Sequence, residues 1–182
     1  MMLLKSIGKE YFEEMYTNEG ANLLEVSSQK PVMLIFLRHF GCTFCRESLA
    51  DLAEQRAGIE ETGMQIIFVH MAENPVAEDY FKKYKLEGVA HISDTACRYY
   101  RTFGLGKGSF SQLYGLRTWM RGFEAGVVKG HGGPELNPTL GDSTQMPGIF
   151  VIRNGEIIDS YIHKVASARP DYLKLARCCV IP

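Results

Sequence analysis

Two short runs of consecutive hydrophobic residues stand out in the first half of the chain. Residues 31–37 read PVMLIFL and residues 64–70 read MQIIFVH. Runs of this length and composition are typical of strands buried on both faces of a sheet. Between them, apolar residues recur on one helical face, at Cys45, Leu49, Leu52, Ala53 and Ile59. The pattern predicts a strand–helix–strand unit with a parallel, right-handed crossover.

The same criteria extend this pattern toward the C-terminus. They predict a helix over 75–84, a strand over 90–93, a helix over 95–103 and a last helix that begins near Pro170. Asn154-Gly155 separates two further apolar runs, at 149–153 and 156–162. This dipeptide is the strongest short signal for a hairpin, because both central residues of the turn need positive φ.

The segment 104–148 differs from the rest because it holds eleven of the 18 glycines. Such a segment cannot be mostly regular structure. It nevertheless contains four apolar residues on one helical face, with arginines nearby, which predicts an amphipathic helix: Leu113, Leu116, Met120 and Phe123, beside Arg117, Trp119 and Arg121. The arginines are expected to face water, although they could also line a pocket for an acidic or flat substrate. We interpret residues 1–182 as one domain with a glycine-rich insertion at about 104–148.

Composition narrows the classes of function. The chain is 46% hydrophobic and 23% charged, with a formal net charge of -1, so no overall positive charge attracts nucleic acid or an anionic membrane. Residues 1–16 lack the apolar core of a secretory signal, and no stretch approaches membrane-spanning length. A cytoplasmic location is therefore expected. In a reducing compartment, a close pair of cysteines is more often catalytic or metal-binding than structural.

The stretch Arg38–Glu47, RHFGCTFCRE, joins the end of a predicted strand to the start of a predicted helix. The free N–H groups and the dipole of a helix start stabilise an anion. A cysteine thiolate, the form that attacks disulfides and peroxides, is such an anion. Cys42 is the expected nucleophile, and Cys45, one turn deeper, the resolving thiol. Arg38 and Arg46 are expected to stabilise the thiolate.

Two other interpretations of this cysteine pair stay open. A zinc site needs two more ligands at similar spacing, and the adjacent Cys178 and Cys179 are poorly suited to bind one zinc tetrahedrally. The two thiols could also be inert packing groups, because free cysteine packs as a small hydrophobic residue. We expect redox chemistry, without a metal or a bound cofactor.

Several motifs together resemble the AhpC/TSA-like "peroxiredoxin-like" family of the thioredoxin-fold superfamily. They are RHFGCTFCRE, Ser93-Asp94 ahead of a helix that ends in Phe103-Gly104, GDSTQMPGIFVIRNGEI and the closing IHKVASARPDYLKL. The resemblance covers roughly residues 31–175. It implies an α/β, thioredoxin-like fold, with a central mixed sheet flanked by helices and the insertion placed before the cis-proline strand. The Met146–Pro147 bond would then be cis, and Pro147 would shape the substrate groove opposite the cysteines; a trans-proline that ends a glycine-rich loop is the alternative.

The sequence also departs from the family pattern. Typical peroxiredoxins carry proline and a threonine or serine seven and three residues before the reactive cysteine, where this chain has Ile35 and His39. His39 either replaces the missing hydroxyl donor or faces solvent at a strand end. Thioredoxins carry a buried aspartate six residues before the first cysteine, and here that residue is Phe36.

The remaining candidate residues are expected to have structural roles. Cys97 is expected to be a packed thiol, with a further redox thiol as the alternative. Cys178 and Cys179 are expected to be spare thiols near the C-terminus, although one of them could resolve a sulfenic acid at Cys42. Asp142 and Gln145 are expected to hold their loop.

These observations favour an enzyme: a thiol-dependent oxidoreductase that reduces hydrogen peroxide or organic, lipid-type peroxides through a Cys42–Cys45 dithiol/disulfide cycle. A general protein disulfide reductase of the thioredoxin type is the first alternative, and a non-catalytic thioredoxin-like binding module is the second. The electron donor would be a thioredoxin- or glutathione-type thiol. The sequence leaves the oligomeric state open, a homodimer included.

Overall fold

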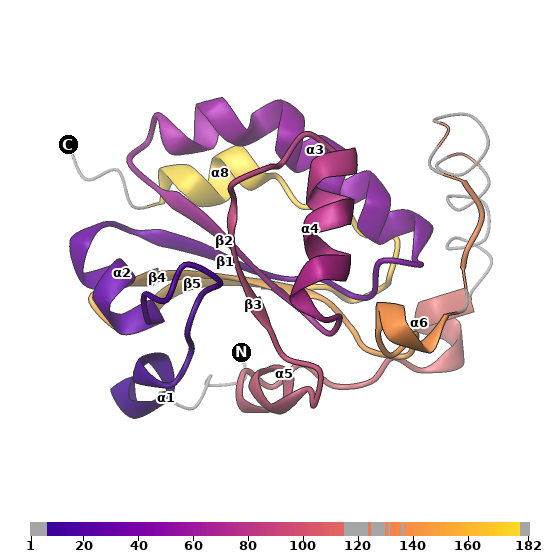
Figure 1. The fold of residues 1–182 in the computed structure, drawn as a ribbon, viewed down its shortest axis with the longest axis horizontal. Helices are drawn as coiled ribbons and strands as arrows, with labels where there is room; N and C mark the ends of the chain where they lie inside the picture. The colour runs from indigo at the N-terminus through magenta and orange to yellow at the C-terminus, as the bar shows by residue number, and fades with distance from the viewer. Residues whose placement is uncertain (1–6, 115–123, 125–129, 131, 136, 179–182) are drawn as a thin grey trace.

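The computed structural model describes residues 7–114, 124, 130, 132–135 and 137–178. A five-stranded sheet in the order β3-β2-β1-β4-β5 forms its centre (Figure 1). The strands are β1 (Val32–Phe36), β2 (Gln65–His70), β3 (Ala90–Ser93), β4 (Gly148–Arg153) and β5 (Glu156–Ile162). Strands β1, β2 and β3 are parallel, whereas β4 runs antiparallel to both β1 and β5. The sheet is therefore mixed, as the sequence predicts.

Helices cover both faces of the sheet. They are α1 (Lys9–Glu13), α2 (Leu23–Gln29), α3 (Thr43–Glu60), α4 (Asn74–Lys83), α5 (Arg98–Thr102), α6 (Phe110–Tyr114), the 3-10 helix η2 (Pro138–Leu140) and α8 (Tyr172–Arg177). In Figure 1, α3, α4 and α8 lie on one side of the sheet and α1 and α5 on the other. The architecture is the three-layered α/β arrangement expected for a thioredoxin-like fold.

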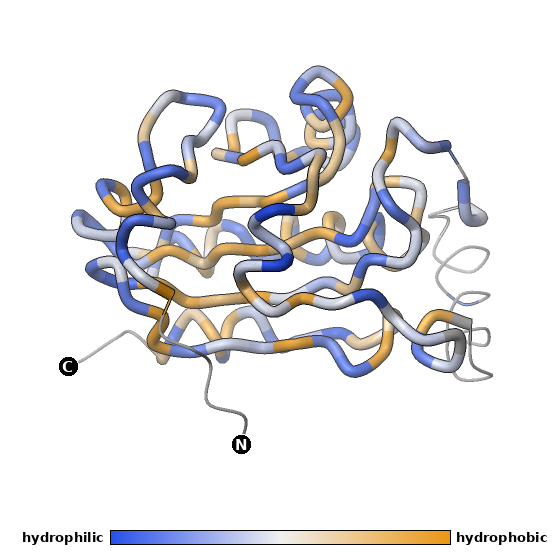
Figure 2. The backbone as a smooth tube through the Cα atoms, turned by 90° about the horizontal axis from the view of Figure 1, so that it is seen from below, coloured by the Kyte–Doolittle hydropathy of each residue, from blue (hydrophilic) through white to orange (hydrophobic). Residues whose placement is uncertain are grey.

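Strand β1 shows why the sheet needs both layers. Its side chains alternate, so that Met33 and Ile35 join the core under α3, while Leu34 and Phe36 join the core under α1 and α5. All five residues of the strand are buried. Figure 2 shows hydrophobic segments running along the strands through the middle of the fold, with hydrophilic segments concentrated in the surrounding loops.

A tyrosine from α5 ties two strand ends together next to the cysteine segment. The side chain of Tyr100 is fully buried, and its hydroxyl is shared between the carbonyl oxygens of Leu37, after β1, and Val69, in β2. The N–H of Leu37 also donates to the Val69 carbonyl (2.9 Å). These bonds hold the chain in place directly before Arg38.

Most of the predicted elements are confirmed within one to three residues. The β1-α3-β2 unit is parallel, and Asn154 (φ 52°) and Gly155 (φ 70°) form the hairpin turn with positive φ at both positions. Helix α5 begins at Arg98, later than expected, because Cys97 adopts a left-handed conformation (φ 52°). The sequence analysis did not predict α1 and α2, although α2 begins with a capping box that a motif search could have found.

The expected cis peptide bond before Pro147 is wrong, since no cis bond occurs in the part of the chain that the structure describes. Backbone pairing supports the extended, trans chain that enters β4. Met146 donates its N–H to Gly106 (3.1 Å), and Gly108 donates to Thr144 (2.8 Å). In the part of the insertion that is described before residue 115, α6 is the only helix. The predicted amphipathic helix runs from Leu113 to Phe123, and most of that range lies outside the described residues.

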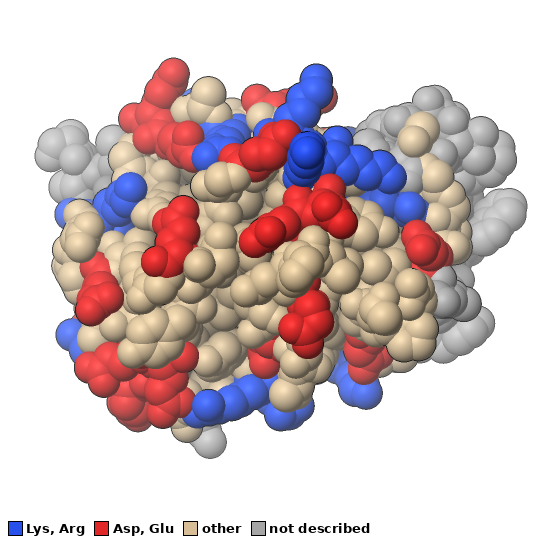
Figure 3. Space-filling model, in the orientation of Figure 1, with Lys and Arg blue, Asp and Glu red and all other residues tan. Residues whose placement is uncertain are grey.

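Acidic and basic side chains are interspersed on the face drawn in Figure 3. None of the helices in the described ranges is long and apolar enough to cross a membrane.

Candidate active site around Cys42 and Cys45

The cysteine pair lies where the chain leaves β1 and enters α3. Cys42 is the N-cap residue of α3, with extended backbone angles, and Cys45 lies in the first turn of the helix. At this position the unpaired N–H groups of the helix start stabilise negative charge. Both cysteines are reduced in the structure and buried, with 4% and 5% of their surface exposed. The pair is therefore covered rather than displayed on the surface.

Arg38 contacts the first sulfur directly. Its Nη1 donates to Cys42 Sγ at 2.9 Å, and its Nη2 donates to the carbonyl of Ser143. The guanidinium is itself buried, so this charged hydrogen bond is screened little by solvent. Arg38 is thus positioned to stabilise a thiolate at Cys42.

Cys45 has a different environment. Burial, followed by the neighbouring Cys42, raises the pKa of the Cys45 thiol well above its usual range, while the Arg38 backbone and guanidinium oppose this shift to a smaller extent. At neutral pH Cys45 is consequently a thiol that must lose its proton before its sulfur can attack.

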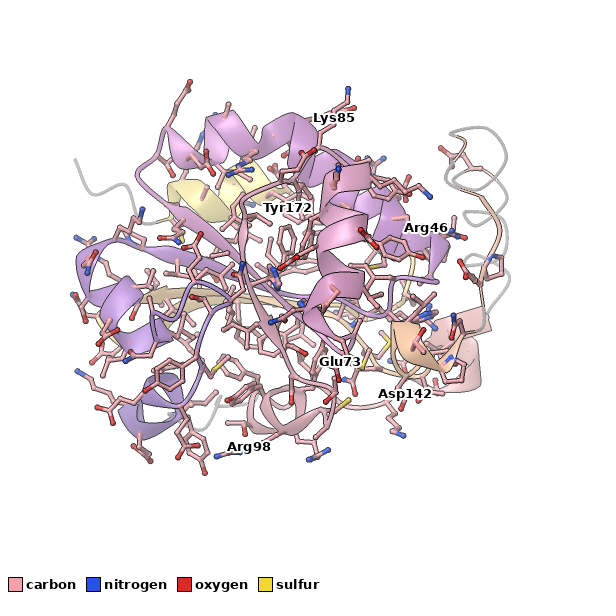
Figure 4. All side chains as sticks on the ribbon, viewed as in Figure 1. Arg46, Glu73, Lys85, Arg98, Asp142 and Tyr172 are labelled. Carbon is pink, nitrogen blue, oxygen red and sulfur yellow. The ribbon has the colours of Figure 1, made fainter. Side chains whose placement is uncertain are left out.

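Arg46 does not bond to either sulfur in this structure. Its Nη2 donates to the carbonyls of Gly132 (3.3 Å) and Gly133. Figure 4 shows Arg46 at the end of α3 that faces this segment. Arg46 therefore holds a loop through hydrogen bonds, and its charge acts on the Cys45 thiol only through space, where it opposes the rise in the pKa of Cys45.

Residues 132–135, which we call the strap, cross the start of α3. Thr43 Oγ1 donates to the Gly132 carbonyl (3.0 Å), and the N–H of Glu135 donates to the carbonyl of Gly41 (2.8 Å). A Cβ on Gly41 would lie 2.0 Å from the Glu135 carbonyl oxygen. Glycine at position 41 is thus required for the strap to pack this closely.

A cavity of about 20 Å³ lies beside the cysteines. It is lined by both sulfur-bearing residues, by Arg38 and Pro147, and by mainly apolar side chains from β1, β4 and α3. Its polar lining also includes Ser48, His163 and Tyr172. A space of this size holds about one water molecule. Pro147 thus lines the same cavity as both cysteines, on a trans bond.

His39 is not seen to replace the missing hydroxyl donor. Its side chain is buried, and no hydrogen bond joins it to Cys42 in the described part of the chain. Burial, with Arg38 as the second cause, lowers the pKa of His39 to about 4. The imidazole is therefore neutral near pH 7, and the donor to the sulfur is Arg38.

The other cysteines lie apart from the site. Cys97 is half-buried at the start of α5, and burial together with Asp94 raises the pKa of its thiol. Cys178 is exposed at the C-cap of α8 and does not line the cavity beside Cys42 and Cys45. Cys179 lies outside the described residues. No group of three His, Cys, Asp or Glu side chains within the described ranges is arranged to hold a metal ion.

Asp142 and Gln145 hold their loop, as expected. Asp142 Oδ1 accepts hydrogen bonds from the N–H (2.8 Å) and the hydroxyl (2.6 Å) of Thr144, and these lower the pKa of Asp142 to about 2. Gln145 donates to the carbonyl of Leu105 (2.9 Å). Both residues therefore support the approach to β4 rather than the sulfurs.

The sequence analysis missed three features of the site. It assigned no role to the strap, to His163, which follows β5, or to Tyr172, which lies between α8 and the sheet (Figure 4). His163 and Tyr172 belong to the closing IHKVASARPDYLKL motif, but nothing in the local sequence marks them or the strap as part of the site, because each is far from the cysteines along the chain.

Known proteins with the same fold were found among solved structures and not by sequence. No family model matches the sequence, and no curated protein matches it. Solved structures of peroxiredoxins do match. Peroxiredoxin Q of Xanthomonas campestris has a TM-score of 0.65 at 13% identity, with 97% of each chain covered. Peroxidoxin BcpB of Mycobacterium tuberculosis has a TM-score of 0.55 at 17% identity, with 91% of each chain covered.

A third match is to a longer protein. Peroxiredoxin 6 of Arenicola marina has a TM-score of 0.59 at 10% identity, over 90% of this chain but only 66% of that one. At these identities the likeness shows a shared fold. The chain has the peroxiredoxin type of thioredoxin-like fold.

Proposed function

We propose that this protein is a thiol-dependent peroxidase in which Cys42 reduces a peroxide and Cys45 then closes a disulfide with it. The observation that carries the proposal is the 2.9 Å hydrogen bond from Arg38 to Cys42 Sγ at the start of α3. The Arg38 guanidinium and the N-terminus of α3 both act on the Cys42 sulfur. Both favour its thiolate, which is the form that attacks a peroxide.

The reaction has two steps on the protein. In the first, the Cys42 thiolate attacks one peroxide oxygen and the O–O bond breaks. The leaving oxygen takes up one proton, which replaces the proton that the Cys42 thiol released on ionisation, so the products are Cys42 sulfenic acid and an alcohol or water. In the second, Cys45 attacks the Cys42 sulfur, which forms the disulfide and releases water. A thiol reductant of the thioredoxin or glutathione class would then return both cysteines to the thiol state.

Burial of the site favours a peroxide over a protein disulfide as the oxidant. Cys42 is 4% exposed, and the cavity beside it is about 20 Å³. A small peroxide needs little more room than one water molecule. A protein disulfide would have to reach a sulfur covered by Arg38 and the side chains around the cavity. The Xanthomonas campestris bacterioferritin comigratory protein, which shares the fold at 13% identity, is credited with alkyl peroxide reduction, and this supports an organic peroxide as a second substrate.

Mass spectrometry after one equivalent of peroxide tests the proposal. We expect the wild type to lose two hydrogens in a Cys42–Cys45 disulfide, and Cys45→Ser to accumulate sulfenic acid at Cys42, trapped by a dione reagent. Cys42→Ser should consume no peroxide. Cys97→Ser serves as a matched control and should behave as the wild type.

Two results would contradict the proposed function. One is oxidation that appears first at Cys97 or Cys178. The other is wild-type protein that leaves peroxide intact while it reduces the disulfides of an added protein, which would favour the disulfide-reductase alternative.

A further inference from the structure

One buried polar group beside the cysteines has no role in the two steps above. His163 follows β5 and lines the same cavity as Cys42 and Cys45. It is 8% exposed, and its Nδ1 is buried without a hydrogen-bond partner in the described structure. Leaving a buried nitrogen unpaired destabilises the folded state, so a native protein that keeps one needs a reason.

The environment of His163 keeps its ring neutral. The ring packs edge-on against Tyr161, with 5.0 Å between ring centroids. Burial lowers the pKa of His163 to about 4, against a smaller opposing effect of the Pro147 backbone. A neutral imidazole with a free nitrogen can accept a proton.

Cys45 needs such a proton acceptor. Its thiol is buried and resists ionisation, yet its sulfur must act as a nucleophile when the disulfide closes. The ionisable groups that line the cavity with it are Cys42, Arg38, His163 and Tyr172. Arg38 is a permanent cation, and burial raises the pKa of Tyr172 well above its usual range. Of these groups, only His163 has a neutral ring nitrogen with a free lone pair that can accept a proton.

We propose that His163 is the general base for disulfide closure, an inference that rests on the proposed peroxidase function. His163 Nδ1 takes the Cys45 thiol proton, directly or through one water in the cavity. The Cys45 sulfur forms a bond to the Cys42 sulfur, and the S–O bond of the sulfenic acid breaks. The imidazolium returns the proton to the departing hydroxide, so that one disulfide and one water are formed and His163 is again neutral.

Single-turnover kinetics separates this role from a structural one. Reduced protein is mixed with one equivalent of hydrogen peroxide and quenched at intervals, and mass spectrometry counts sulfenic acid and disulfide. In His163→Asn we expect sulfenic acid to form at the wild-type rate and disulfide to form about 100-fold more slowly. The closure rate of the variant should rise about tenfold per pH unit, as hydroxide replaces the base, whereas wild-type closure should be nearly flat around neutrality.

His91→Asn is the matched control. His91 is also a buried histidine, and its Nε2 has no hydrogen bond in the described structure, although it lies 3.9 Å from Glu78 Oε1. Its Nδ1 pairs with His70 (2.9 Å), and His91 does not line the cavity. It should close its disulfide at the wild-type rate.

Each outcome decides between the alternatives. Equal closure rates in His163→Asn and wild type, or equal slowing of both steps, overturn the role of His163 and leave the peroxidase function intact. Wild-type protein that forms no sulfenic acid overturns both. If His163→Asn does not fold, the wild-type pH profile decides: closure that rises about tenfold per pH unit in the wild type shows that no internal base acts.

Discussion

Replacing Arg38 tests the hydrogen bond on which the site depends. In Arg38→Met the 2.9 Å contact to Cys42 Sγ is lost, while the volume of the side chain is largely kept. A charge-assisted hydrogen bond in a buried site is worth about 1.5–3 kcal/mol. Because the bond strengthens as the sulfur becomes an anion, most of this energy should appear in the reactivity of Cys42. The expected loss is about 10- to 150-fold in the rate of Cys42 oxidation, at about 1.4 kcal/mol per factor of ten.

The assay is the second-order rate of Cys42 oxidation by hydrogen peroxide in a Cys45→Ser background, followed by quenching and mass spectrometry. Arg38→Lys keeps the charge but loses the fork that also binds Ser143, so its rate should lie between those of wild type and Arg38→Met. Arg169→Met is the matched control, because Arg169 pairs with Asp51 on α3 and not with a sulfur. It should keep the wild-type rate.

An unchanged rate in a folded Arg38→Met protein would refute this reasoning. It would mean that the helix N-terminus alone activates Cys42. A rate that falls equally in Arg169→Met would indicate that loss of any nearby arginine disturbs the site.

Three further predictions concern stability and the strap. Acid should destabilise the fold below about pH 6.5, because the buried histidines stay neutral in the folded state while those of the unfolded chain bind protons. Urea unfolding should show a free energy of unfolding that is lower near pH 5 by about 2 kcal/mol for each such histidine. These histidines are His39, His70 and His163, with pKa values lowered to about 4, 3 and 4. Gly41→Ala should displace the strap at Glu135, seen as faster proteolysis at residues 132–135. Asp94→Ala should cost about 1–2 kcal/mol in urea unfolding, because Asp94 caps three N–H groups of α5.

Each of these predictions has a result that contradicts it. Urea midpoints that agree at pH 7.5 and pH 5 would show that the histidines titrate freely in the folded protein. Unchanged proteolysis of Gly41→Ala would show that the strap does not pack on Gly41. Asp94→Asn, which keeps one acceptor oxygen, is the control for Asp94→Ala and should lose less stability.

The sequence was sufficient to predict the fold and the location of the cysteines, because both depend on local patterns. The apolar run over β1 needs two covering layers, and a cysteine before the first residue of α3 meets free N–H groups whatever the rest of the chain does. Asn154-Gly155 likewise determines its own turn.

The remainder of the site depends on contacts between distant residues. The strap accepts a hydrogen bond from Thr43, about 90 residues earlier in the sequence. His163 and Tyr172, which line the cavity, lie in the C-terminal part of the chain. Local sequence does not determine the isomer of the Met146–Pro147 bond either, since the pairing of that loop with Gly106 and Gly108 supports the trans form. Only the folded arrangement shows these contacts.

Tyr100 has a consequence for how substitutions in α5 should be interpreted. Its single hydroxyl donates to carbonyl oxygens at the ends of β1 and β2, and the chain after β1 continues directly into Arg38. The phenol stands on the face of the sheet away from α3, yet its removal would free the segment that aims the guanidinium at the sulfur. A mutational scan would therefore score position 100 with the catalytic residues, although the tyrosine ring touches neither peroxide nor thiol.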